Sequence, residues 1–209
     1  MGGAAGSAGT AGAAGSAGAA GAGGTAGSAG AAGSGGSAGA AGAAGSGGVG
    51  GSTGAVFPCS EQGIRDAIAE GGGPHTFDCG TPELVVTREQ IIIDNDVILD
   101  GEGKLTVDGN EGHPVFSSAG HVTAELRGLT VTRGGGEGIF DFGGTLTLTN
   151  STVSGNTETG IFNRGTLTLM NSTVSGTIQE GIFNQGGTVT LTNSTVSGNT
   201  EEGIFNQVG

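Results

Sequence analysis

Aspartates gather around the only lysine of the chain, in the segment between residues 94 and 108. They are Asp94, Asp96, Asp100 and Asp108, and the lysine is Lys104. A pair of carboxylates can serve as general acid and base in glycoside hydrolysis, and carboxylates are also calcium ligands. The spacing of Asp94 and Asp96 predicts that both lie on one strand face. Aspartate is also an ordinary turn residue, and no histidine partners these positions, so we expect a structural role and no enzyme.

A second set of carboxylates recurs just before a repeated Gly-Ile-Phe phrase. Its members are Glu137, Glu158, Glu180, Glu201 and Glu202. Stacking would bring several of them within about 5 Å of one another, which is repulsive unless a cation intervenes. Glu158, Glu180 and Glu202 are therefore weak candidates for calcium. A solvated acidic rim with no metal or other cofactor is the favoured interpretation.

Two further columns of side chains form extended surfaces. The phenylalanines Phe140, Phe162, Phe183 and Phe205 each follow the isoleucine of the Gly-Ile-Phe phrase. If they point outward, they form an apolar stripe that could stack on sugar rings or contact a protein, and the sequence leaves their direction open. The threonines form Thr-X-Thr columns at Thr145, Thr166 and Thr188 and at Thr147, Thr168 and Thr190. Such an array makes ice binding a remote alternative, although threonine is also a common exposed strand residue.

The recurrence of two phrases predicts the elements that position these residues. Gly-Ile-Phe begins at residues 138, 160, 181 and 203, in steps of 22, 21 and 22 residues. Asn-Ser-Thr-Val-Ser-Gly begins at residues 150, 171 and 193. Self-similarity at this period is typical of a solenoid of stacked coils.

Each coil alternates apolar and polar residues in three short runs, which predicts three strands with one buried face. The aligned apolar columns are Leu146, Leu167 and Val189; Leu148, Leu169 and Leu191; Val153, Val174 and Val196; and Ile139, Ile161, Ile182 and Ile204. We therefore predict an all-β parallel β-helix with coils of 21–22 residues. At one bend, Asn150, Asn171 and Asn193 are expected to form an amide ladder along the axis.

A cap is expected at residues 55–80, before the coils at 81–209. A helix is predicted from Ser60, which can cap its start, to Glu70, with Gly71 ending it. Cys59 and Cys79 flank this helix, and they are predicted to form a disulfide in an oxidising compartment.

Residues 1–54 have glycine at every third position from Gly3 and carry no charge. Such a segment cannot bury a core, so we expect a disordered, flexible tether. The net charge of -13 belongs to the remainder of the chain and argues against binding nucleic acid. Neither a signal peptide nor a transmembrane span is recognisable.

The cap, with Cys59 followed by Ile64-Arg65-Asp66-Ala67-Ile68, and the Gly-Ile-Phe and Thr-Leu-Thr-Leu-Thr-Asn-Ser-Thr-Val-Ser-Gly coils resemble a known group. It comprises bacterial secreted and surface right-handed β-helix repeat proteins, within the pectate-lyase-like superfamily. They are akin to polymorphic outer-membrane proteins, and many carry a Cys-Ser-Leu-Arg-Glu-Ala-Ile cap, which this chain matches in part. The resemblance covers residues 57–209.

This resemblance implies right-handed coils and an extracellular or cell-surface location, but no specific chemistry. We expect a structural or adhesive module that contacts a polysaccharide or a protein. The alternative is a fragment of a polysaccharide lyase or glycoside hydrolase. The sequence stops within a repeat, so further coils or an anchor are expected downstream.

Overall fold

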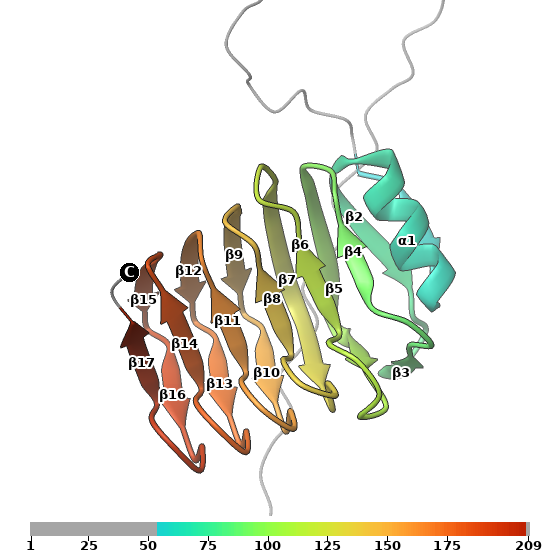
Figure 1. Ribbon diagram of the computed structural model, residues 1–209. Coiled ribbons are helices and arrows are strands. Elements are labelled where there is room, and N and C mark those ends of the chain that lie inside the picture. Colours follow the sequence, from blue (N-terminus) through green and yellow to red (C-terminus); the bar gives the residue numbers. More distant parts are fainter. Residues whose placement is uncertain (1–53, 208–209) are drawn as a thin grey trace, which may run out of the picture. The chain divides into compact units, whose positions relative to one another are not determined.

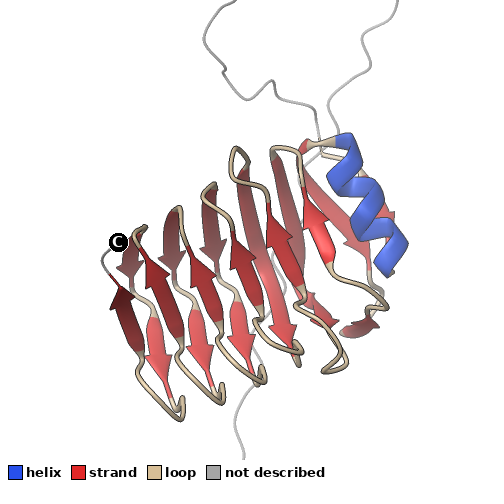
Figure 2. Cartoon of the chain, in the orientation of Figure 1, coloured by secondary structure: helices blue, strands red, loops and turns tan. Residues whose placement is uncertain are grey.

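The computed structural model describes residues 54–207, so the predicted tether, apart from Gly54, lies outside the described residues. Strands stack as successive coils, with one helix at the N-terminal end of the stack (Figure 1; Figure 2). The elements are β1 (Val56–Pro58), α1 (Glu61–Glu70), β2 (Gly72–Asp78), β3 (Glu83–Val86), β4 (Ile91–Ile93), β5 (Val97–Asp108), β6 (Phe116–Ser118), β7 (Thr123–Thr132), β8 (Ile139–Asp141), β9 (Thr145–Thr149), β10 (Thr152–Ser154), β11 (Ile161–Asn163), β12 (Thr166–Met170), β13 (Thr173–Ser175), β14 (Ile182–Gln185), β15 (Thr188–Thr192), β16 (Thr195–Ser197) and β17 (Ile204–Gln207).

Two parallel sheets enclose the core. The 11-stranded sheet contains the path β1-β2-β5-β7-β10-β13-β16 together with β3, β9, β12 and β15, and the 6-stranded sheet has the order β17-β14-β11-β8-β6-β4. One repeat supplies three strands, such as β9, β10 and β11, and each pairs with its counterpart in the next coil. The chain is therefore a parallel β-helix, as the repeats predict.

The register of the strands confirms the predicted apolar columns. Val153 lies beside Val131 and Val174, and Ile161 lies beside Ile139 and Ile182. These side chains are fully buried. Burial of such aliphatic columns is the main stabilising contribution to each coil.

Asparagine and glycine occupy the bends, where the backbone enters the left-handed region. Asn150, Asn171 and Asn193 have φ of 51°, 50° and 50°, a conformation that asparagine tolerates better than most residues. Their side chains are exposed.

An amide ladder exists, but in a different column from the one predicted. Asn163 Nδ2 donates to Asn184 Oδ1 at 2.6 Å, and Asn184 Nδ2 donates to Asn206 Oδ1 at 3.0 Å. Asn163 is buried at the end of β11, where water does not reach its amide. The amide therefore needs hydrogen-bond partners within the protein. The amides of Asn150, Asn171 and Asn193 are exposed at the bends, so they can form hydrogen bonds with solvent water instead of with one another.

The N-terminal cap has the predicted form. The Gly63 N–H donates to Ser60 Oγ at 3.1 Å, and Gly71 ends α1 with φ of 68°. Ile64 and Ile68 lie on the buried face of α1. A disulfide joins Cys59 to Cys79, so the segment before α1 is tied to the end of the first long strand. No helix among the described residues is long and apolar enough to cross a membrane.

Candidate interaction surface

The four phenylalanines that follow the isoleucine column point outward from the six-stranded sheet. Phe140, Phe162 and Phe183 are half-buried and Phe205 is 37% exposed. The structure thus answers the question that the sequence left open. Because these residues pair in register between β8, β11, β14 and β17, the rings form one continuous row, which we call the Phe ladder.

Three rings of the Phe ladder stack on one another, and the fourth, Phe205, is inclined to Phe183 by 41°. The centroids of Phe140 and Phe162 are 4.5 Å apart with planes inclined by 11°, and those of Phe162 and Phe183 are 5.0 Å apart with planes inclined by 8°. The faces of the inner rings are therefore covered by neighbouring rings. Solvent meets mainly ring edges, so the predicted stacking of sugar rings on these faces is not available in this arrangement.

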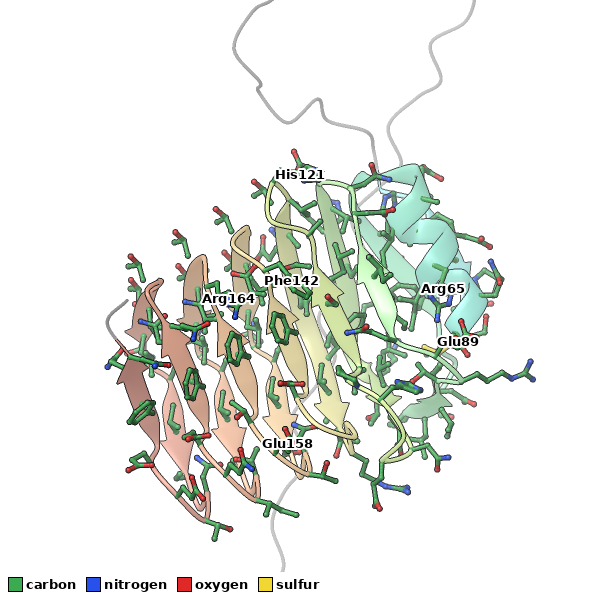
Figure 3. The ribbon with its side chains drawn as sticks, viewed as in Figure 1. Arg65, Glu89, His121, Phe142, Glu158 and Arg164 are labelled. Atoms are coloured by element: carbon green, nitrogen blue, oxygen red, sulfur yellow. A yellow bond between two sulfur atoms is a disulfide. The ribbon has the colours of Figure 1, made fainter. Side chains whose placement is uncertain are left out.

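An aromatic ring and a guanidinium extend the ladder on one side. Phe142 is 54% exposed and packs against Phe140 with a centroid distance of 4.2 Å and planes inclined by 35°. The Arg164 guanidinium lies 5.2 Å from the Phe162 ring centroid, a cation–π contact. Arg164 Nε also donates to Gln185 Oε1 at 2.7 Å. Figure 3 shows Phe142 and Arg164 on one side of the row of rings and Glu158 on the opposite side.

The aromatic row is confined to the four C-terminal coils. In the same column towards the N-terminus, Phe140 pairs with Ser117 and Ser117 pairs with Ile92. Ser117 is only 5% exposed, so it interrupts the apolar stripe. The candidate surface therefore begins at β8 and runs to β17.

The predicted acidic rim borders the Phe ladder. Carboxylate oxygens of Glu180, Glu201 and Glu202 lie within 4.8 Å of one another. Glu180 is 9% exposed and its Oε2 accepts a hydrogen bond from Thr159 Oγ1 at 3.1 Å. Glu158 does not join this cluster. Three carboxylates can supply at most six of the 6–8 oxygens that calcium takes, so cation binding at this cluster stays a prediction.

Several carboxylates of the N-terminal coils form ion pairs, whereas those of this rim form none in the part of the chain that the structure describes. Within the described range, ion pairs occur only between residues 61 and 133. In one of them Arg127 Nε lies 2.7 Å from Glu125 Oε1. The hydrogen bond from Arg127 is the largest influence on the pKa of Glu125 and holds it below its usual value. The rim glutamates make no such ion pair among the described residues.

The opposite face of these coils carries hydroxyl groups and no charge. Its threonine columns align as predicted: Thr145, Thr166 and Thr188, and Thr147, Thr168 and Thr190. No charged residue occurs in the segments 142–157, 165–179 and 186–200. All charge of the C-terminal coils is therefore on the strands and loops next to the Phe ladder.

The aspartates considered for catalysis do not converge on one strand face. Asp94 and Asp96 lie in the turn between β4 and β5 and are exposed, so the predicted placement on a strand is wrong. Asp96 Oδ1 accepts a hydrogen bond from the Thr123 N–H at the start of β7 at 2.7 Å, so this carboxylate links two successive coils. Asp108 is at the far end of β5, buried, and paired with Arg133 at 3.2 Å.

Comparison with known proteins agrees with this architecture. Residues 78–208 match the family model described as the right handed beta helix region. No curated protein and no solved structure matches the chain.

Proposed function

The chain belongs to the right-handed β-helix family, and we propose that it is a structural repeat module that adheres to other macromolecules through the Phe ladder. A β-helix is a scaffold that hosts many activities, so the function has to be argued from the surface. The observation that carries the proposal is the unbroken outward row of neighbouring rings from Phe140 to Phe205, of which Phe140, Phe162 and Phe183 are stacked.

Exposed aromatic residues in a continuous row are uncommon on soluble proteins, and they mark interaction sites more often than chance. The ladder has one ring per coil, so contacts repeat along the axis. Repeated weak contacts give an affinity that rises with the number of coils engaged. An extended surface of this kind suits adhesion better than catalysis, which needs groups that converge around a reacting atom.

Protein is the partner class that the geometry favours over polysaccharide. Sugars typically bind by laying a pyranose ring against an aromatic face, and the faces of Phe162 are covered by Phe140 and Phe183. Ring edges and the half-exposed Phe142 instead offer an apolar ridge that packs against apolar side chains. A polysaccharide partner remains the competing outcome of the test below.

An extracellular or cell-surface location completes the proposal. The Cys59–Cys79 disulfide supports it because disulfides persist in oxidising compartments. The Gly-rich segment before residue 55 would then separate the module from its point of attachment.

The test is retention of the complete chain on a panel of immobilised proteins and polysaccharides, including cellulose and polygalacturonate. The double variant Phe162→Ala/Phe183→Ala is compared with Thr147→Ala/Thr168→Ala, which alters the opposite face of the same region. We expect binding to at least one protein, weakened about tenfold or more only by the phenylalanine changes. Retention that both double variants reduce equally, or that neither reduces, contradicts the proposal.

The same panel addresses the enzymatic alternative. Polygalacturonate incubated with the chain, with and without calcium, is assayed for unsaturated and reducing sugar ends. We expect none to be released. Release that Asp94→Ala or Asp96→Ala abolishes would replace the adhesive module with a polysaccharide-cleaving enzyme.

A further inference from the structure

We propose that the partner of the Phe ladder is a basic protein segment, in which a row of apolar side chains is bordered by lysine or arginine. This inference rests on the proposed function and names the chemistry of its ligand. It is carried by the charges that border the ladder and by the absence of ion pairs to them among residues 54–207.

The charge of the C-terminal coils is strongly one-sided. After residue 133 the chain has six acidic residues and one basic residue, so the net charge is 1 − 6 = −5. The basic residue, Arg164, already contacts the rings of Phe140 and Phe162. The acidic residues other than the buried Asp141 follow the loops beside the ladder, at Glu137, Glu158, Glu180, Glu201 and Glu202.

Proximity of these carboxylates makes an incoming cation favourable. Glu180, Glu201 and Glu202 lie close enough to repel one another, and a lysine or arginine between them relieves this repulsion. Glu180 is nearly buried, so water screens its charge less than it screens that of an exposed carboxylate. The partner therefore gains apolar contact at the ring edges and ionic contact with the glutamates in the loops that precede the phenylalanines.

Two other occupants fit this arrangement less well. A second copy of the chain would bring an identical acidic rim against the first, which costs free energy because like charges then face each other. A neutral glycan would use neither the carboxylates nor the covered ring faces. A basic segment uses both features, and electrostatic attraction would also speed its association.

The experiment uses the complete chain and an amphipathic peptide of leucine and lysine as the probe. Two matched peptides carry glutamine or glutamate in place of every lysine, and cellulose is the glycan control. Affinity is measured at low and at high ionic strength. The chain is tested as wild type, as Phe162→Ala/Phe183→Ala, as Glu158→Gln/Glu202→Gln, and as Glu70→Gln/Glu83→Gln. This last variant removes the same charge from exposed positions near the N-terminal end.

We expect the lysine peptide to bind at least about tenfold more tightly than the glutamine peptide, and the glutamate peptide not to bind. The advantage should shrink at high ionic strength. Glu158→Gln/Glu202→Gln should weaken binding by about tenfold, whereas Glu70→Gln/Glu83→Gln should change it by less than about twofold.

Failure of this inference is distinguishable from failure of the adhesive function. If the glutamine peptide binds as tightly as the lysine peptide and the phenylalanine changes abolish both, the basic partner is wrong and the Phe ladder remains the contact surface. If the lysine peptide binds equally to the wild type and to Phe162→Ala/Phe183→Ala, the ladder is not the contact surface and both proposals are wrong. Binding of cellulose that depends on the phenylalanines overturns the protein partner.

Discussion

Ser118 Oγ donates a 2.6 Å hydrogen bond to Asp141 Oδ1, while Asp141 Oδ2 is buried without a donor among the described residues. Asp141 occupies the position in β8 that Asn163 and Asn184 occupy in the next two coils. It therefore stands where an amide would continue the ladder. A carboxylate in this position accepts hydrogen bonds but offers no donor to Asn163.

We predict that Asp141→Asn stabilises the protein. The new amide nitrogen would reach acceptors equivalent to those used by Asn184 Nδ2, which donates to Gly187 O at 2.9 Å and to Asn206. The gain should be about 1–2 kcal/mol, because a buried oxygen without a partner is replaced by a paired donor. Thermal unfolding followed by circular dichroism measures the change. The reciprocal substitution Asn163→Asp should lower the melting temperature, and an unchanged or lower value for Asp141→Asn would show that the carboxylate is favourable there.

A second prediction contrasts the inside and outside of one coil. Val174→Asp places a charge in a fully buried column and should cost several kcal/mol, enough to unfold the module. Thr168→Asp places the same charge on the outward threonine column and should change stability by less than about 1 kcal/mol. Melting temperatures of the two variants decide the assignment, and equal values would contradict it.

The sequence was sufficient to predict the coils because their apolar residues repeat in register. Val153 and Val174, or Ile161 and Ile182, recur at a fixed spacing, and only parallel stacking brings each pair together. The cap followed from local signals in the same way: Ser60 at the start of α1, Gly71 at its end, and a cysteine on each side.

Side-chain direction at the bends could not be predicted from periodicity. Phe162 follows the buried Ile161, and whether the chain turns after Ile161 or after Asn163 decides which way the ring points. The amide ladder depends on the same choice, because the exposed Asn150 and the buried Asn163 are both bend-adjacent asparagines. Asp94 and Asp96 continue the alternation of the preceding residues, which predicts a strand, but β4 ends at Ile93.

The third prediction concerns the pH dependence of the cap. Burial raises the pKa of Glu61, but hydrogen bonds from the Arg65 side chain and the Arg88 N–H outweigh burial and hold it below its usual value. A lowered pKa in the folded state means that this stabilisation is present above the unfolded-state pKa of about 4.3. It is lost as the pH falls through the lower folded-state value.

Wild type should therefore be more stable than Glu61→Gln by about 1 kcal/mol at neutral pH, and the difference should disappear near about pH 3. Melting curves across this range measure it. Glu70→Gln, an exposed change in the last turn of the same helix, is the control. A difference between wild type and Glu61→Gln that is independent of pH would contradict the role assigned to the carboxylate.

The fourth prediction concerns the disulfide. Mass spectrometry of non-reduced peptides should recover Cys59 linked to Cys79. Closing a loop with a sequence separation of 20 residues stabilises the folded state by about 3 kcal/mol in the chain-entropy model. Reduction should accordingly lower the melting temperature. Two thiols that alkylate freely in native, unreduced protein would remove the support for an extracellular location.

The face that makes contact can be identified directly by photo-crosslinking from the last coil. The photoreactive residue p-benzoylphenylalanine is placed either at Phe205 in β17 or at Thr190 in β15, both exposed positions on different sheets. Each protein is irradiated with the leucine–lysine peptide, and the yield of covalent adduct is measured. We expect a strong adduct from position 205 and little from position 190. Equal yields from the two positions, or adduct formed mainly from position 190, would contradict the claim that the Phe ladder is the contact surface.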